Sequence, residues 1–346
     1  SPDGKRLAFT AFDRLWLKDL PDGAARRVTR TEAGEYHPVW SPDGRWVAFV
    51  SWGDSSGGHI IKAPADGRGQ PVPLTRVPAL YYNPAWSPDG ARIVATRGAA
   101  RELREAPGVF FGPLGAEFVW VPAAGGDVTL IAPGGTRDVA HFRADDPNRI
   151  YAYSFVEGLV SFRWDGTDVK QHLRVTGAIP PGAGDPHEDG IEFLPRRIFP
   201  IATQDATDAM EPVPQAPPAG LILIAPKGDQ ALAQVGNDIY TVTIPKVGGP
   251  VTTISVASPE GAPVPVRKLT DIGGEFPSWS ADGQKVYWGI GNALLSYDLV
   301  RAKAMEDSVK AAARAKADTT ARFQALLDTL RTTRAKVDSL TRAKTL

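Results

Sequence analysis

The stretch Gly53-Asp54-Ser55-Ser56-Gly57 could do chemistry, because it fits the G-x-S-x-G pattern of a serine nucleophile. In enzymes with that pattern, the serine lies on a sharp turn from a strand into a helix, beside backbone N–H groups that stabilise an oxyanion. Here strand-like sequences both precede it (Phe49-Val50-Ser51-Trp52) and follow it (His59-Ile60-Ile61-Lys62). These flanks predict a loop between two strands, and five-residue patterns mean little without their context.

Histidine and carboxylate side chains are the other candidates for chemistry. The five histidines are scattered along the chain, at His37, His59, His141, His172 and His187. They form neither a His-x-His nor a His-Glu-x-x-His pattern, which a zinc hydrolase site would need. Asp185-Pro186-His187-Glu188-Asp189 is dense in metal-ligand atoms, but its Gly/Pro-rich surroundings predict a solvated loop. We therefore expect no catalytic residue, no metal site and no cofactor in this segment.

The chain is instead built on a repeated turn motif, which we call the corner. Pro-x-Trp-Ser-Pro-Asp-Gly occurs at residues 38–44 and 84–90, a variant with Ala281 occurs at 277–283, and a truncated copy opens the chain at Ser1. Proline presets φ for a tight turn, aspartate bonds nearby backbone, and glycine adopts a positive φ. Strand-forming residues flank each corner, and Val47-Ala48-Phe49-Val50 is apolar on both faces, which predicts a strand enclosed between two layers.

Each corner is followed by a strand, an Asp-Gly turn and a strand that ends in threonine, as at residues 59–61, 66–67 and 73–75. Four short strands in about 40 residues are typical of a β-propeller blade. Degenerate copies fill the middle of the chain. The sequence thus predicts an all-β propeller (residues 1–300) of about six four-stranded blades, near residues 1–33, 34–78, 79–135, 136–177, 191–270 and 271–300.

Both ends of this ring are incomplete in the sequence. An inner strand should precede Ser1, and the last blade has no obvious outer strand. The chain also begins inside a repeat without a methionine or a signal peptide, so we interpret it as a segment of a longer protein. The net charge of zero does not favour nucleic acid, and no apolar run is long enough to span a membrane.

Three stretches do not follow the repeat. Residues 97–117 and 177–219 are rich in Gly and Pro and predict surface insertions. The second insertion is either disordered or functional. Within it, residues 191–195 are a candidate for the inner strand of the fifth blade. Residues 301–346 lack Gly and Pro and predict a helical extension, with eleven Lys/Arg and five Asp/Glu. This extension is either a solvated helix, continuous or interrupted near Asp318, or a partner surface.

The central channel remains as the candidate binding site, because the innermost strand of each propeller blade lines the axis. Repeat alignment places the following residues at the starts of these strands: Glu35, Tyr36, His37, Tyr81, Tyr82, Asn83, Asp138, His141, Glu275 and Phe276. Carboxylate, imidazole and aromatic groups together could hold a ligand or the end of a peptide. They could equally form only the wetted lining of the channel.

The corner motif, followed by a strand ending in Leu-Thr, resembles the TolB-like, WD-like β-propeller repeat of bacterial exported proteins. The resemblance covers residues 1–135 and 266–299, and the middle only through degenerate copies. The order of further features resembles the N-terminal propeller of bacterial amidohydrolases with TolB-like repeats. These features are Leu7-Ala8-Phe9-Thr10-Ala11, Gly57-Gly58-His59-Ile60, Tyr151-Ala152-Tyr153, residues 160–168, residues 228–234, residues 269–274 and the charged helix.

This resemblance implies a periplasmic or secreted protein whose metal-dependent catalytic domain, with zinc as a candidate metal, follows Leu346. The propeller would then gate substrates or bind that domain. Two alternatives stay open. One is a free-standing interaction propeller that binds other cell-envelope proteins. The other is the propeller of a prolyl-oligopeptidase-type serine peptidase, which screens peptides by size.

Overall fold

The computed structural model describes residues 1–99, 116–178, 216–245 and 251–344, with side chains of the last helix as far as residue 336. Contacts divide the chain into two units. The first contains residues 1–283 and 287–295, and the second contains residues 284–286 and 296–346. The predicted insertions fall largely on residues 100–115 and 179–215, outside the described residues, as do residues 191–195.

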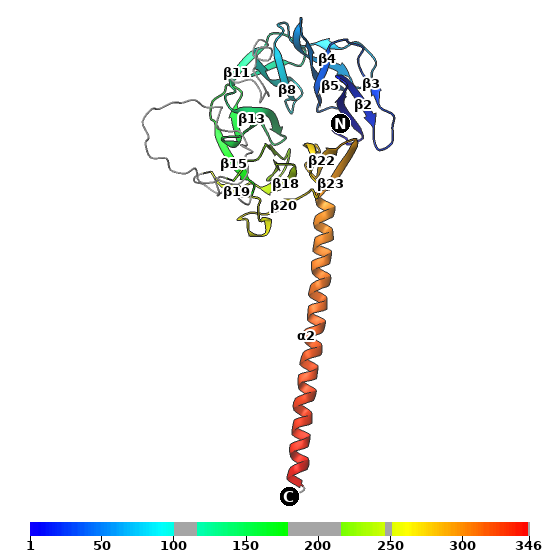
Figure 1. The fold of residues 1–346 in the computed structure, drawn as a ribbon, viewed down its shortest axis with the longest axis vertical. Coiled ribbons are helices and arrows are strands. Elements are labelled where there is room, and N and C mark those ends of the chain that lie inside the picture. The colour runs from blue at the N-terminus through cyan, green and yellow to red at the C-terminus, as the bar shows by residue number, and fades with distance from the viewer. Residues whose placement is uncertain (100–115, 179–215, 246–250, 345–346) are drawn as a thin grey trace, which may run out of the picture. The chain divides into compact units, whose positions relative to one another are not determined.

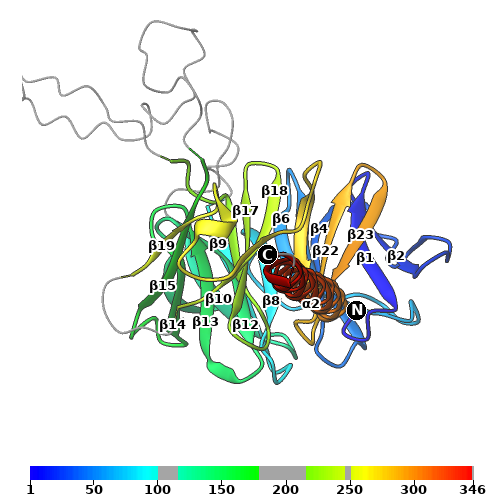
Figure 2. The ribbon, with the colours of Figure 1, turned by 90° about the horizontal axis from the view of Figure 1, so that it is seen from below.

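The first unit is a ring of blades, as the sequence predicts (Figures 1 and 2). Its first three sheets contain β1 (Arg6–Ala11), β2 (Arg14–Asp19), β3 (Arg26–Arg27); β4 (Gly34–Trp40), β5 (Trp46–Gly53), β6 (Gly57–Pro64), β7 (Val72–Pro73); and β8 (Leu80–Trp86), β9 (Arg92–Gly98), β10 (Glu117–Pro122), β11 (Thr129–Pro133).

The other three sheets contain β12 (Arg137–Arg143), β13 (Asp146–Ser154), β14 (Gly158–Arg163), β15 (Lys170–Thr176), β19 (Thr253–Ser255); β16 (Leu221–Ile224), β17 (Gln230–Val235), β18 (Asp238–Thr243), β20 (Val266–Lys268); and β21 (Glu275–Trp279), β22 (Lys285–Ile290), β23 (Ala293–Asp298). A 3-10 turn, η1 (Pro259–Gly261), precedes β20.

Six antiparallel blades confirm the predicted architecture, but the strand counts differ from four in three of them. Blades 1 and 6 each have three strands within the described residues. Blade 4 gains a fifth strand, β19, which pairs parallel with β15. The innermost strand of blade 5 is β16, which directly follows the second insertion.

The corners fold by the same local hydrogen bonds in every well-formed copy. In the second blade, Asp43 accepts hydrogen bonds from the Ser41 hydroxyl at 2.6 Å and from the Arg45 N–H at 3.0 Å. The Trp46 N–H donates to Ser41 Oγ at 2.9 Å, and Gly44 takes a φ of 68°. These bonds, the Ser41 hydroxyl first, lower the pKa of Asp43 to about 2. Ser87 and Asp89 repeat the pattern in blade 3.

The apolar core lies between neighbouring blades. Val47 and Phe49 of β5 are fully buried in a cluster shared with blade 1, whereas Ala48 and Val50 are buried in a cluster shared with blade 3. Alternate side chains of one strand therefore serve two interfaces, as the apolar run in the sequence predicts. Cation–π interactions also connect neighbouring blades. The guanidinium of Arg92 lies 4.8 Å from the Trp120 ring and 4.7 Å from the Trp164 ring.

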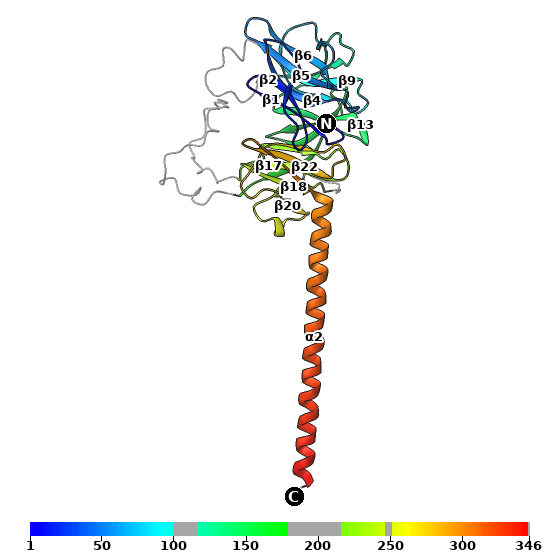
Figure 3. The ribbon, with the colours of Figure 1, turned by 90° about the vertical axis from the view of Figure 1, so that its right-hand side faces the viewer.

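The second unit consists mainly of α2 (Leu299–Lys344), a single continuous helix of 46 residues (Figure 3). The predicted helical extension is confirmed, and it is not interrupted at Asp318. Several large apolar side chains of its described part, among them Phe323, Leu326 and Leu330, are exposed. Among the described residues, no helix is both long and apolar enough to cross a membrane.

Candidate functional site

The starts of four innermost strands share an unusual backbone conformation. His37, Asn83, Val139 and Phe276 occupy the same repeat position in β4, β8, β12 and β21, and each has a φ between 49° and 54°. Residues with a Cβ rarely adopt this conformation, and it is least favourable for a β-branched residue such as Val139. Such strain costs about 1–3 kcal/mol per residue and concentrates at binding sites. Of these residues, His37 and Asn83 lie near Asp138, and we call this group of three residues the channel mouth, after its predicted place.

Asp138 is the polar centre of the channel mouth. Its Oδ2 atom accepts a hydrogen bond from the Asn83 amide at 2.9 Å, which links blades 3 and 4. Its Oδ1 atom accepts from the Thr96 hydroxyl at 2.8 Å and from the Val139 N–H at 2.6 Å. A carboxylate has about four acceptor positions. These three bonds hold Asp138 in place and leave it one further acceptor position.

His37 contributes an imidazole to the same mouth from blade 2. Desolvation by the surrounding protein lowers the pKa of His37, while the nearby Asp138 carboxylate opposes this effect. The pKa is lowered on balance, which favours the neutral imidazole, with one nitrogen that can accept a hydrogen bond. The side chain nevertheless has an exposed surface through which a ligand can reach it.

Two further predicted residues lie on blade 6. Glu275 and Phe276 both project into solvent from β21, and the Phe276 side chain is 84% exposed. An aromatic ring this exposed on an innermost strand offers apolar contact area that the fold itself does not use.

The tyrosines predicted for the channel are held by neighbouring segments to different degrees. Tyr81 is buried, and its hydroxyl donates to the Val77 carbonyl at 3.0 Å, so it belongs to the core between blades 2 and 3. Burial and the Asp13 carboxylate raise the pKa of Tyr36, which is partly buried beside the hairpin of blade 1. Tyr82 is also partly buried.

Glu35, which the repeat alignment predicts in the channel lining, is instead fully buried beside blade 1. Its carboxylate accepts hydrogen bonds from the Leu15 N–H at 2.7 Å, from the Thr31 hydroxyl at 2.8 Å and from the Thr29 hydroxyl. Repeat alignment locates the start of this strand but does not specify which of its side chains face the channel, because successive residues of a strand face opposite sides. Its role is to connect blade 2 to blade 1.

His141 is also predicted in the lining, but both of its ring nitrogens are occupied by the fold. Nδ1 lies 2.8 Å from the Val139 carbonyl, and Nε2 accepts the Ile224 N–H of blade 5 at 2.9 Å. Because a backbone N–H can only donate, the proton of the neutral ring is on Nδ1. Desolvation lowers the pKa of His141 to about 4. This histidine connects blades 4 and 5 and is not available to a ligand.

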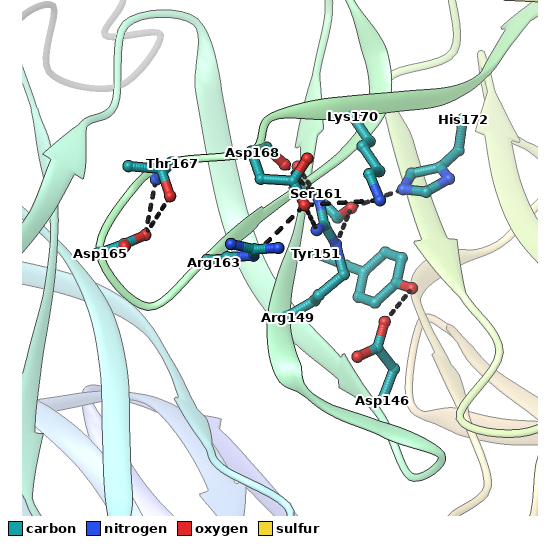
Figure 4. Close-up of polar contacts among 10 residues, drawn as sticks. All are labelled: Asp146, Arg149, Tyr151, Ser161, Arg163, Asp165, Thr167, Asp168, Lys170 and His172. Atoms are coloured by element: carbon teal, nitrogen blue, oxygen red, sulfur yellow. Dashed lines mark hydrogen bonds and ion pairs between the residues drawn. The ribbon is translucent and has the colours of Figure 1, made fainter.

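A second polar cluster, which the sequence does not reveal, lies within blade 4 (Figure 4). Arg149 is buried and donates to Ser161 Oγ at 3.0 Å and to Asp168 Oδ2 at 2.6 Å. Ser161 Oγ lies 2.7 Å from His172 Nε2, and desolvation, followed by Arg149, lowers the pKa of His172 to about 4. Ser161 is 0% exposed, so this serine–histidine pair stabilises β13, β14 and β15 and cannot reach a substrate.

The remaining candidates from the sequence are the Gly53–Gly57 motif and the histidines His59 and His187. Residues 53–57 connect the antiparallel strands β5 and β6, which confirms the predicted loop. His59 Nδ1 lies 3.1 Å from both the carbonyl and the hydroxyl of Thr75. His187 lies outside the described residues. Within the described ranges, no three His, Asp or Glu residues are grouped so that they could hold a metal ion.

Comparison with known proteins gives short sequence matches and broad structural ones. No protein-family model matches the chain. Tricorn protease homolog 1 of Streptomyces coelicolor is 41% identical over 66 residues, which are 19% of this chain and 6% of that protein. A second tricorn protease homolog of the same organism is 49% identical over 53 residues, 14% of this chain and 4% of that protein. The matched segments thus span only a small fraction of those relatives.

Solved structures match over most of the chain. TolB from Acinetobacter baumannii has a TM-score of 0.52 at 15% identity, over 86% of this chain and 62% of that one. An oligogalacturonate lyase in complex with manganese has a TM-score of 0.50 at 13% identity, over 87% and 73%. A gluconolactonase from Xanthomonas campestris has a TM-score of 0.50 at 12% identity, over 85% and 82%. At these identities the comparison concerns the fold alone. The chain therefore has the fold of the TolB-like β-propellers, with six blades.

Proposed function

We propose that the chain is a non-catalytic binding propeller whose channel mouth holds the amino end of a peptide or a basic side chain. The convergence of His37, Asn83 and Asp138 from three blades onto one strained mouth carries this proposal. The charged group at the mouth is a carboxylate, and the imidazole there is neutral. A ligand group that donates hydrogen bonds and carries positive charge complements such a site.

Phe276 adds the second element of recognition. Its ring is 84% exposed on blade 6, in the repeat position that His37 and Asn83 occupy on blades 2 and 3. Apolar side chains next to the amino end of a peptide would contact it, and ammonium groups are attracted to aromatic faces.

Calorimetry with tetra-alanine as the probe tests this proposal. We expect tetra-alanine with a free amino end to bind and its N-acetylated form to bind at least about tenfold more weakly, since a charged hydrogen bond contributes roughly 1.5–3 kcal/mol. Asp138→Asn should remove the difference between the two peptides, whereas Asp145→Asn, an exposed aspartate beside Arg143, should leave it unchanged. Equal affinity for both peptides would show that the mouth is only a solvated channel lining.

We further propose that the propeller belongs to an exported, periplasmic or secreted, amidohydrolase-like enzyme and gates substrates for its metal-dependent domain. The order of sequence features from Leu7 to the charged helix supports this assignment. Any catalytic metal, such as zinc, would then be bound beyond Leu346. The coding sequence after Leu346 tests it: a strand that ends in His-x-His supports the assignment, and a stop codon favours a free-standing interaction propeller.

A peptidase is the second candidate, because the sequence matches are to tricorn protease homologs. In that case the propeller would screen peptides for a serine peptidase domain, and a nucleophile elbow followed by Asp and His would occur after Leu346. On either assignment, the chain alone should hydrolyse neither amides nor esters, with or without zinc. Turnover that survives repurification and disappears in Asp138→Asn would contradict this.

A further inference from the structure

A cavity of about 470 Å³ lies between the corners of blades 2 and 3. Its lining includes Trp46 and Lys62 of blade 2 and Trp86 and Gly90 of blade 3. None of the lining residues belongs to the channel mouth, so the cavity is a separate feature of the molecule. Sites for small molecules commonly have volumes of about 300–1,000 Å³, with aromatic walls and a few polar groups.

The equivalent space between blades 1 and 2 is filled by an arginine. Arg6 lies five residues after the serine of its corner, and its guanidinium lies 4.7 Å from the Trp40 ring. The same guanidinium donates hydrogen bonds to the Gly44 carbonyl at 3.1 Å and to the Ala65 carbonyl at 3.2 Å. A cation of blade 1 therefore occupies an aromatic face and two acceptors that blade 2 presents.

Between blades 2 and 3 the residue types at two equivalent positions differ. Trp46 stands where blade 1 has Arg6, since the N–H of each bonds to the serine hydroxyl of its corner. Lys62 stands where blade 1 has Leu17, since each pairs with an alanine at the same register position. The Lys62 ammonium lies 4.5 Å from the Trp46 ring, so the cation now comes from β6 and the aromatic ring from the corner. This exchange opens the cavity, because no long side chain crosses it as Arg6 does.

Lys62 takes over only part of the role that Arg6 has in the preceding interface. Its Nζ atom donates to the Ala123 carbonyl at 2.6 Å. In the part of the chain that the structure describes, the Gly90 carbonyl accepts no hydrogen bond, and no cation lies over the Trp86 ring. These two groups correspond to two that Arg6 contacts in blade 2. The cavity therefore keeps an acceptor and an aromatic face for a ligand.

The Lys62 ammonium has hydrogen-bonding capacity left over. An ammonium has three donors, and the Ala123 carbonyl uses one of them. Among the described residues no carboxylate pairs with this ammonium, and desolvation lowers the pKa of Lys62. A ligand atom that accepts a hydrogen bond from Nζ would therefore stabilise the charge.

Asp89 contributes an acceptor from blade 3. Its Oδ1 atom accepts from the Ser87 hydroxyl and from the Ala91 N–H, whereas Oδ2 has no partner among the described residues. The other two charged groups of the lining, Asp43 and Arg45, pair with each other at 2.6 Å. The lining thus contains two cations and two anions, and its charge sums to zero.

We propose that this cavity binds one unit of a neutral saccharide, either a free sugar or part of a glycan chain. Sugar hydroxyls both donate and accept hydrogen bonds, so they can serve the Lys62 ammonium, the Gly90 carbonyl and the Asp89 carboxylate. The C–H face of the sugar ring packs against Trp86. Ligands with a net charge fit less well, because Asp89 repels an anion and Lys62 repels a cation.

Nuclear magnetic resonance of the tryptophan indole groups tests the site. Each of the nine tryptophans gives one indole N–H signal, and Trp46→Phe and Trp86→Phe assign the two that matter. We expect both signals to shift saturably with at least one of glucose, galactose, mannose and N-acetylglucosamine, while that of Trp279 on blade 6 stays unchanged. Methyl glycosides distinguish the two sources. Equal binding of the glycoside indicates a unit within a chain, and weaker binding indicates a free sugar.

Three variants separate this site from general adhesion of sugars. Lys62→Leu introduces the residue that blade 1 has at this position and should weaken binding at least about tenfold, because a hydrogen bond to a charged group is lost. Trp46→Arg combined with Lys62→Leu recreates the Arg6 and Leu17 pair of blade 1, so an arginine should fill the cavity and abolish binding. Lys5→Leu, on an exposed lysine of the first corner, should bind like the unmodified chain. Circular dichroism establishes that each variant is folded.

Three results would overturn the proposal. The first is that none of the four sugars shifts the signal of Trp46 or Trp86. The second is that Lys62→Leu binds the sugar as tightly as the unmodified chain. The third is that ethylguanidine binds more tightly than every sugar, because the cavity would then be a site for arginine side chains. If the double variant does not fold, the comparison of Lys62→Leu with Lys5→Leu decides alone.

Discussion

His141→Gln should make the protein less sensitive to acid. The neutral His141 ring accepts the Ile224 N–H and donates to the Val139 carbonyl, and its pKa is lowered from 6.5 to about 4 by desolvation. A lowered pKa means that the unfolded chain takes up the proton first as the pH falls. Stability is therefore complete above pH 6.5 and is lost between pH 6.5 and pH 4.

The expected size of this effect follows from the shift in pKa. Each pKa unit corresponds to about 1.4 kcal/mol, so lowering the pH from 7.5 to 4.5 should cost the wild-type protein about 2–3 kcal/mol through His141. Glutamine can accept the Ile224 N–H but does not titrate, so His141→Gln should not show this loss. His172, whose pKa is also lowered to about 4, adds a loss that both proteins share.

Urea unfolding followed by tryptophan fluorescence at pH 7.5, 6.0 and 4.5 measures the difference. The chain has nine tryptophans, and the variant's circular dichroism at pH 7.5 provides the control for folding. We expect the free energies of unfolding of the two proteins to converge, or to cross, as the pH falls. Parallel losses in both proteins would refute the assignment of a buried neutral His141.

Two further predictions concern groups that the fold buries. Glu35→Ala should lower the free energy of unfolding by about 1–3 kcal/mol, because it leaves the Leu15 N–H unpaired in the interior. Glu32→Ala on the exposed neighbour should change it little, and thermal unfolding scans would measure both. Arg149→Met should raise the pKa of His172, since the guanidinium is one of the causes that lower it, and an NMR titration of the imidazole in which this pKa does not rise would contradict that account.

The fold follows from the sequence because the same local physics recurs at each corner. The Ser-Pro-Asp-Gly turns are self-contained, and the apolar runs after them predict enclosed strands, so the six blades could be counted from their copies. The fifth strand of blade 4 could not be predicted, because β15 and β19 are distant in the sequence and pair in parallel. No local pattern specifies such a pairing.

The candidate site was predictable only to the level of the strand. Repeat alignment locates the starts of the inner strands, and it brings His37, Asn83 and Asp138 to one mouth. It does not specify which side of a strand each residue faces, so Glu35 and His141 were placed with the lining although the fold uses both as links between blades. The Arg149–Ser161–His172 cluster carries no sequence pattern, because its members belong to three different strands.

The parallel pairing of β15 with β19 has a mechanical consequence. Thr253–Ser255 lies between β18 and β20 of blade 5 in the sequence but pairs with the edge strand of blade 4, and Thr176 also bridges to Pro218, which precedes β16. The polypeptide of blade 5 is therefore paired with blade 4 at two points, one before its first strand and one before its last. A single backbone cut by a protease between residues 178 and 216 should leave two fragments that migrate as one particle under native conditions and separate only in denaturant.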